Sequence, residues 1–212
     1  MKLTKKEIDA ITNLYDLGYV ISLTEIHGGM VNNNFRLKTD QGEYVVRKLG
    51  YQYTFYWRNQ KRLQHNVTEY LNRKNFYYKI PTFIKNKNGN YVSRIGKSLF
   101  EVYPKIKGKS YDRIDRNKLK ESAKALAIFH KSVAKYPLPS MPKRKKWLLE
   151  EFSRMKKIKS KNKLDKIMIN NIDKVNNTYK GMLDLDLGGK LIIAHGDMTS
   201  DNLLFIDDKA VG

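Results

Sequence analysis

The 212-residue sequence predicts an α+β protein in which an antiparallel sheet of five or six strands, with one inserted helix, precedes a mostly helical part. In the first half, short runs rich in β-branched and aromatic residues alternate with tight-turn sequences, as in antiparallel sheets. In the second half, apolar residues recur every three or four positions, as in amphipathic helices. Hydrophobic residues make up 41% of the chain, which indicates a globular protein rather than a disordered one.

The first half opens with a helix that begins at a capping-box pair, Thr4 and Glu7, and is expected to end at Gly18. Asp40-Gln41-Gly42 and Asn88-Gly89 are turn sequences that join strands into hairpins. Strands are expected over residues 19–26, 34–38, 43–49, 82–86, 91–94 and 98–103, and the inserted helix is expected over residues 59–74.

The second half follows a connector at residues 103–108, and Pro137, Pro139 and Pro142 interrupt it. The spacing of its apolar residues predicts helices over residues 119–133, 145–158 and 164–179. Two short apolar runs then follow, at residues 191–194 and 203–206. We expect both runs to be buried strands that flank a polar loop.

The formal net charge of the chain is +21, from 42 Lys and Arg against 21 Asp and Glu. Because the basic residues are spread along the whole chain, we attribute most of this charge to surface composition; an anionic ligand, including a nucleotide, and nucleic acid binding are the alternatives. The absence of Cys excludes disulfides and thiolate metal sites and fits a reducing compartment. No apolar run approaches the roughly 18 residues of a membrane span, and the N-terminus has no secretory apolar core, so we expect a cytoplasmic protein with no membrane partner.

The polar loop between the last two apolar runs carries a carboxylate and a carboxamide, Asp197 and Asn202. This spacing suits phosphoryl transfer, in which the Asp accepts the proton of an attacking hydroxyl and the Asn carbonyl oxygen binds Mg²⁺. A plain polar turn is the alternative, since Asp and Asn are common in turns. We interpret His195 as a residue that organises this loop rather than as a proton carrier.

Two further segments suit nucleotide binding. Gly28 and Gly29 follow the first strand and would allow the backbone to approach a bulky anion, and Asn32 could hydrogen-bond phosphate oxygens. A plain hairpin turn is the alternative. In the connector, Pro104 keeps a backbone carbonyl and Ile106 keeps an N–H, which permits the acceptor and donor that a nucleotide base needs.

A basic residue on the third strand is a candidate phosphate ligand. Alternation places Val45 and Arg47 on one face of the sheet and Lys48 on the other, so Lys48 would replace Arg47 if the register shifted by one residue. Arg binds phosphate in a bidentate manner. Glu69 on the inserted helix could pair with Arg47 and fix its orientation. Solvated surface charges are the alternative for both residues.

In the order glycine turn, basic strand residue, helix acid, connector and polar loop, these features resemble the aminoglycoside phosphotransferase/choline kinase-like family, small-molecule relatives of protein kinases. The resembling segments are GGMVNNNF at 28–35, EYVVRK at 43–48, Glu69, FEVYPKIKG at 100–108, ALAIFH at 125–130 and IIAHGDMTSDNLLF at 192–205. HGDxxxxN between apolar runs is the specific motif, whereas the other segments are informative only together.

The resemblance implies a protein-kinase-like two-lobed fold, in which a five-stranded antiparallel sheet with an inserted helix forms the N-terminal lobe. The ATP-binding lobe would span residues 1–103, the hinge 104–108 and a partial catalytic lobe 109–212. The implied reaction uses ATP and Mg²⁺ and transfers the γ-phosphoryl group to a hydroxyl of a small molecule. The roles carried over are Asp197 as base, Asn202 as metal ligand, Arg47 as ATP phosphate ligand with Glu69 as its partner, and Gly28, Gly29 and Asn32 as the phosphate-side loop.

The sequence departs from the family after the polar loop. The family places another acidic metal ligand on the strand after the catalytic hairpin, whereas Asp207 and Asp208 here form the expected turn and that acid would lie beyond Gly212. We therefore expect a truncated chain with weak or absent catalysis, because a neutral Asn202 alone holds Mg²⁺ poorly.

The sequence does not identify the acceptor. Aminoglycosides, choline or ethanolamine, homoserine, methylthioribose and amino sugars all remain open, although the charge of +21 argues mildly against polycationic aminoglycosides. The alternative function is a non-catalytic basic protein that binds nucleotides or nucleic acid, with nucleic acid the less favoured partner because that reading leaves the order of the motifs unexplained.

Overall fold

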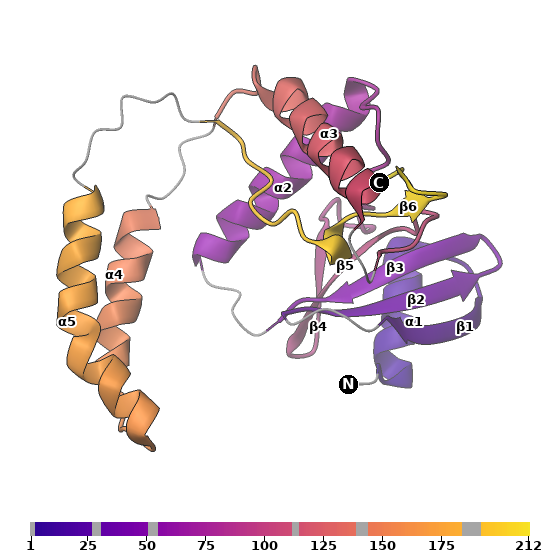
Figure 1. The fold of residues 1–212 in the computed structure, drawn as a ribbon. Coiled ribbons are helices and arrows are strands. Elements are labelled where there is room, and N and C mark those ends of the chain that lie inside the picture. Colours follow the sequence, from indigo (N-terminus) through magenta and orange to yellow (C-terminus); the bar gives the residue numbers. More distant parts are fainter. Residues whose placement is uncertain (1–2, 27–30, 51–54, 112–114, 139–143, 184–191) are drawn as a thin grey trace. The chain divides into compact units, whose positions relative to one another are not determined.

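The computed structural model describes residues 3–26, 31–50, 55–111, 115–138, 144–183 and 192–212 (Figure 1). It divides into two compact units. The larger unit comprises residues 1–137 and 193–212, and the smaller one comprises residues 138–192. The larger unit contains every candidate site residue that the sequence predicts.

A five-stranded sheet with the order β1-β2-β3-β5-β4 organises the larger unit, and all its neighbouring strands are antiparallel. Its strands are β1 (Val20–Ile26), β2 (Asn33–Thr39), β3 (Gly42–Lys48), β4 (Val92–Ile95) and β5 (Ser98–Pro104). Thr39 pairs with Gly42 across the predicted tight turn. Helix α2 (Phe55–Arg73) is inserted between β3 and β4. The predicted α+β class and five-stranded sheet are therefore confirmed.

Helix α1 (Lys5–Tyr15) covers one face of the sheet. Its capping box is formed as predicted, with Glu7 N donating to Thr4 Oγ1 over 3.2 Å and Thr4 N donating to Glu7 Oε2 over 2.9 Å. Its apolar side joins a buried cluster that includes Ile11, Tyr15, Phe35, Val46 and Phe100. The helix ends earlier than predicted, because the residue after Tyr15, Asp16, already adopts the left-handed conformation (φ 54°) before Gly18 is reached.

The opposite face of the sheet carries Val45 and Tyr103, which pack with Phe83. Helix α2 contributes His65 to this side, where its ring lies 4.5 Å from the ring of Phe83. Farther along α2, Leu71 packs with Val133 of helix α3 (Arg116–Val133) and with Ile193, just before the polar loop. This cluster ties the polar loop to both helices.

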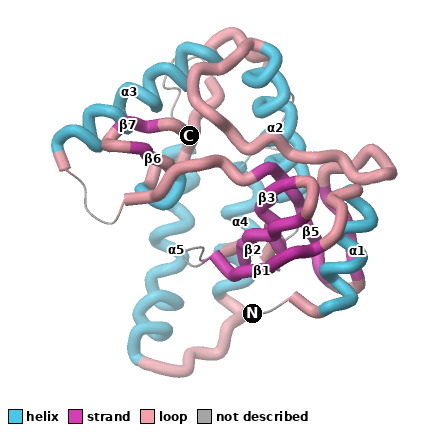
Figure 2. The backbone as a smooth tube through the Cα atoms, turned by 90° about the vertical axis from the view of Figure 1, so that its right-hand side faces the viewer, coloured by secondary structure: helices cyan, strands magenta, loops and turns pink. Residues whose placement is uncertain are grey.

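A short C-terminal hairpin follows the polar loop and consists of β6 (Phe205–Ile206) and β7 (Lys209–Ala210). Its two turn residues, Asp207 and Asp208, have positive φ values of 46° and 61°, as a tight two-residue hairpin turn requires. The hairpin lies beside α3 (Figure 2). The prediction that these two acids form a turn is confirmed.

Two predicted strands are wrong. Residues 82–86 form none: they lie beyond the pairing of β4 with residues 98–101 of β5, and the one backbone hydrogen bond to β5 among the described residues here, from Ile84 N to Val102 O at 2.8 Å, does not make a ladder. Of residues 191–194, residue 191 lies outside the described part, and residues 192–194 are irregular. Ile193 is buried by packing against α2 and α3 side chains instead of by strand pairing.

The smaller unit contains two helices that pack on each other, α4 (Arg144–Met155) and α5 (Lys163–Leu183). The rings of Phe152 and Tyr179 meet edge to face at 5.8 Å, and Lys156 forms an ion pair with Asp173. Within the described ranges, no helix of either unit is long and apolar enough to cross a bilayer.

Candidate active site

The polar loop brings together the two side chains that the sequence predicted to act as a pair. Asn202 Nδ2 donates to Asp197 Oδ2 over 2.9 Å, to Asp197 O over 2.8 Å and to Thr199 Oγ1 over 3.2 Å. Because the nitrogen and oxygen of a carboxamide lie on opposite sides of its carbon, Asn202 Oδ1 is directed away from the carboxylate. Both side chains are exposed, so a substrate hydroxyl and a cation have access to them.

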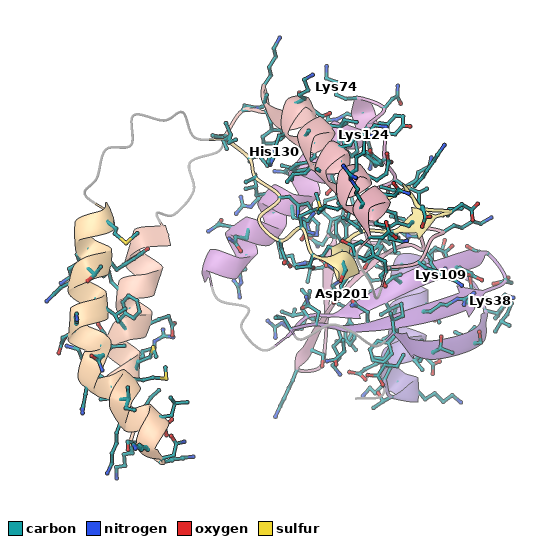
Figure 3. The ribbon with its side chains drawn as sticks, viewed as in Figure 1. Lys38, Lys74, Lys109, Lys124, His130 and Asp201 are labelled. Atoms are coloured by element: carbon teal, nitrogen blue, oxygen red, sulfur yellow. The ribbon has the colours of Figure 1, made fainter. Side chains whose placement is uncertain are left out.

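The local fold of the loop explains this contact. Gly196 adopts a positive φ of 77°, which turns the chain between His195 and Asp197. A 3₁₀ turn, η1 (Ser200–Asn202), then returns the chain toward Asp197, closed by a 3.1 Å hydrogen bond from Asn202 N to Thr199 O. Figure 3 labels Asp201, which lies on the same turn.

His195 contacts the loop through its ring. Asp197 N donates to His195 Nδ1 over 3.4 Å, and the ring packs edge to face on Phe129 of α3 at 5.8 Å. Burial lowers the pKa of His195, an effect that the nearby Asp197 opposes and His130 reinforces. The neutral imidazole can accept the backbone hydrogen bond, which suits the predicted organising role.

On the sheet, three partners hold the guanidinium of Arg47. Its Nε donates to Asn34 Oδ1 over 3.0 Å, its Nη1 to Glu101 Oε1 over 3.2 Å and its Nη2 to Tyr103 Oη over 2.7 Å. Arg47 lies on the face opposite α1, as alternation predicted. Lys48 instead pairs with Glu7 of α1 at 2.7 Å, so the register does not favour Lys48 as the phosphate ligand.

The carboxylate beside Arg47 belongs to Glu101 of β5, and its side chain is fully buried. Lys61 Nζ donates to Glu101 Oε1 over 2.7 Å, and His65 Nε2 lies 3.2 Å from Glu101 Oε2. Burial would raise the pKa of Glu101, but the hydrogen bond with His65 and the charges of Lys61 and Arg47 outweigh it and lower that pKa to about 2. Glu101 is therefore ionised at neutral pH.

The predicted partner of Arg47, Glu69, lies elsewhere. Its carboxylate accepts from Tyr91 Oη and pairs with Lys85 Nζ at 3.4 Å. The predicted pairing of Arg47 with Glu69 is therefore wrong. The physical reason is position along the helix. Lys61 and His65 of α2 lie at the sheet face around Arg47, whereas Glu69, one to two turns farther along, lies beside Tyr91.

The predicted phosphate-side loop is described in part, since Gly28 and Gly29 lie outside the described residues. Asn32 Oδ1 accepts from Gly50 N over 3.2 Å, which ties the chain before β2 to the chain after β3. That bond uses the side-chain carbonyl of Asn32 and not its amide N–H groups, which the sequence predicted as phosphate donors.

The connector has the backbone groups that the sequence predicted. Pro104 ends β5 opposite Tyr44 of β3, and Ile106 lies two residues farther on. Across the described part of the chain, no residue accepts a hydrogen bond from Ile106 N. Just beyond, the backbone of Lys109 exchanges hydrogen bonds of 3.0 and 2.8 Å with Phe205.

The described residues fit a divalent cation only in part. Asn202 Oδ1 would supply one neutral oxygen, and the described ranges contain no group of three or more His, Cys, Asp or Glu side chains arranged to hold a metal ion. Mg²⁺ prefers six oxygen ligands and commonly takes several from water and phosphate. The residues present therefore suit a cation that nucleotide phosphates bring with them better than one held by protein alone.

Sequence reasoning missed Glu101, Lys61, His65, Asn34 and Tyr103, which surround or support Arg47. One signal was present. In the apolar strand of residues 99–103, Glu101 is the only acid and shares the face of Tyr103 by alternation, so a buried carboxylate needed a cation on a neighbouring strand.

Comparisons with known proteins identify the family of the chain. The sequence profile of the phosphotransferase enzyme family (APH) matches residues 22–212. A comparison with curated protein sequences gave no match.

Among solved structures, spectinomycin phosphotransferase APH(9)-Ia with ADP and spectinomycin has a TM-score of 0.57 at 13% identity, over 97% of this chain and 66% of its own. The GDP and kanamycin complex of APH(2")-IIia has a TM-score of 0.60 at 13% identity, over 96% of this chain and 69% of its own. A thermostable mutant of APH(4)-Ia with ADP and hygromycin B has a TM-score of 0.60 at 9% identity, over 99% and 69%.

The chain thus spans 66 to 69% of the length of these structures and shares their fold. Because the family profile covers residues 22–212 and the HGDxxxxN loop lies within it, this chain belongs to the phosphotransferase enzyme family.

Proposed function

We propose that this chain carries the nucleotide-binding and phosphoryl-transfer residues of an ATP-dependent phosphotransferase that acts on a hydroxyl of a small molecule. The observation that carries the proposal is the 2.9 Å hydrogen bond between Asn202 Nδ2 and Asp197 Oδ2. It fixes one carboxylate oxygen and leaves Asp197 Oδ1 to accept the proton of an acceptor alcohol. The alcohol oxygen then bonds to the γ-phosphorus as the bond from that phosphorus to the β–γ bridging oxygen breaks and ADP departs.

The sheet supplies the nucleotide contacts in this proposal. The N–H groups of Arg47 that no described residue binds face the phosphates, together with the amide of Asn32 and the backbone of Gly28 and Gly29. The carbonyl of Pro104 and the N–H of Ile106 hold the base. Mg²⁺ would bind Asn202 Oδ1 and phosphate oxygens, and when bound it supplies positive charge that stabilises the phosphates.

We further propose the lobe boundaries that the sequence suggested: 1–103 for nucleotide binding, 104–108 as hinge and 109–212 as the partial catalytic lobe. The end of β5 at Pro104 and the first backbone bridge of Lys109 to Phe205 support them. The lack of Cys supports a cytoplasmic location.

The ligands of the similar structures support a choice of acceptors to test. Those proteins were solved with spectinomycin, kanamycin and hygromycin B. We therefore propose hydroxyl-rich amino sugars and aminoglycosides as the first acceptors to test, followed by choline and homoserine as amino alcohols.

The test has two steps. Titration of a fluorescent ADP analogue measures nucleotide binding, and γ-labelled ATP with Mg²⁺ and an acceptor panel measures transfer. We expect nucleotide binding and weak transfer to one acceptor class, and Asp197→Asn should lower that transfer by about 100-fold or more. A chain that binds no nucleotide, or a variant that transfers phosphate as well as the parent, would contradict the proposal.

A further inference from the structure

Arg47 is held more completely than a surface arginine. Three of its five N–H groups are bound by Asn34, Glu101 and Tyr103, and its side chain is only 20% exposed. Within the described part of the chain, this leaves two N–H groups for an oxyanion. A guanidinium fixed in this way loses little further freedom when it binds phosphate.

Glu101 is the only ionised acid among these partners, and it has three neighbours of its own. Arg47 and Lys61 both reach Glu101 Oε1, at 3.2 and 2.7 Å, and His65 reaches Oε2 at 3.2 Å. Arg47 and Lys61 bring two positive charges to the single negative charge of Glu101. The surplus of one positive charge in a buried site favours a polyphosphate over a neutral ligand.

The charges at the contact between helix and sheet are the reverse of those predicted from sequence. Helix α2 contributes the ammonium group of Lys61 and the imidazole of His65, and strand β5 contributes the carboxylate of Glu101. The acid on the helix, Glu69, contacts Lys85 and Tyr91 instead. One buried carboxylate therefore joins β3, β5 and α2 at a single point.

We propose that Glu101 is the positioning residue that directs Arg47 toward the nucleotide phosphates, and that Lys61 and His65 attach helix α2 to the same carboxylate. This inference rests on the proposed function, since it names the residue that orients its phosphate ligand. Glu101 itself is fully buried and acts through Arg47 rather than by touching the nucleotide.

A double-mutant cycle on the full chain tests the inference, with the dissociation constant of ADP as the readout. We expect Glu101→Gln to weaken ADP binding about tenfold or more, because the charge-assisted bond that orients Arg47 is lost. In an Arg47→Gln background, the same change should alter ADP binding less than about twofold, because nothing is left to orient. An equal loss in both backgrounds would show a general structural effect and overturn the inference.

Stability is controlled separately, because Glu101→Gln leaves Lys61 buried without its acid. The double variant Glu101→Gln/Lys61→Met removes that surplus charge and should fold while showing the same loss of ADP affinity. Folded Glu101→Gln/Lys61→Met with parental affinity would overturn the inference. Glu43→Gln is the matched control, since Glu43 pairs with exposed Arg36 at 2.7 Å on the same sheet.

A second readout needs no nucleotide. The Nη–H signals of Arg47, which include the bond from Nη1 to Glu101, should be protected from exchange in ¹⁵N-resolved NMR of the parent and of Glu43→Gln, and lost or shifted in Glu101→Gln/Lys61→Met. An unchanged Arg47 signal would overturn the inference even if ADP still binds.

The two readouts together separate this inference from the proposed function. If the signal changes as expected but the parent binds no ADP, the proposed function fails while the orientation of Arg47 by Glu101 stands. A loss of affinity in Glu69→Gln alone would restore the helix acid as the partner.

Discussion

Asn202 Nδ2 and Asp197 Oδ2 lie 2.9 Å apart, although both side chains are on an exposed loop. The same amide nitrogen also binds Asp197 O and Thr199 Oγ1, so the carboxamide is fixed by three acceptors at once. This contact orients the proposed base and the proposed metal ligand together.

The first prediction separates proton transfer from nucleotide binding. Asp197→Asn keeps the size of the side chain and removes its basicity, so phosphate transfer from γ-labelled ATP should fall by about 100-fold or more. The dissociation constant of ADP should stay within about twofold, because none of the proposed nucleotide contacts involves Asp197. Loss of ADP binding together with transfer would instead show that Asp197 supports the fold of the site.

The second prediction uses two adjacent cations on β3. Arg47 faces Glu101 at 3.2 Å, whereas Lys48 faces Glu7 of α1 at 2.7 Å on the other side of the sheet. Arg47→Gln should therefore weaken ADP binding by about 10- to 100-fold. Lys48→Gln is the matched control and should change it less than about twofold. The reverse ranking in calorimetric titration would place the phosphates on the α1 side of the sheet.

Local signals made much of this fold predictable. Thr4 and Glu7, three residues apart, are enough to predict a capping box. The two-residue turn before Gly42 fixes the register of β2 and β3. That register, with alternation, was enough to place Arg47 and Lys48 on opposite faces. The HGDxxxxN spacing was similarly local, because a chain that turns at Gly196 brings Asn202 back to Asp197 within one loop.

The parts that failed depend on contacts between distant segments. Glu69 was chosen because it is the only acid on its helix, but Lys61, His65 and Glu69 are four residues apart on one side of α2, so the position of the helix along the sheet decides which of them reaches the partners of Arg47. That position depends on contacts with distant segments, such as the packing of Leu71 with Val133 of α3, and the sequence of α2 alone does not predict them. Likewise, the apolar run that contains Ile193 was taken for a strand, because a short apolar segment buried between helices has the same sequence pattern as a buried strand.

The third prediction concerns acid stability. Because the folded pKa of Glu101 is about 2, below the usual 4.5, its contribution is fully present above pH 4.5 and is lost as pH falls toward 2. This contribution is on the order of 3 kcal/mol. In urea titrations from pH 7 to 2, Glu101→Gln/Lys61→Met should lose less free energy of unfolding below pH 4.5 than the parent does. Parallel curves would show that Glu101 is not the buried, paired acid described above.

The fourth prediction concerns His195, whose folded pKa is lowered by burial below the usual 6.5. The neutral ring accepts from Asp197 N, so its contribution is present above pH 6.5 and is lost as pH falls through the lower folded value. Imidazole NMR should show His195 titrating below pH 6.5, with the Asp197 amide signal moving at the same midpoint.

Two variants provide the control for this prediction. His195→Asn keeps an acceptor near the position of Nδ1, whereas His195→Ala removes it. The Asp197 amide should therefore stay protected from hydrogen exchange in the first variant and exchange faster in the second, and equal exchange in both would show that the ring does not organise the loop.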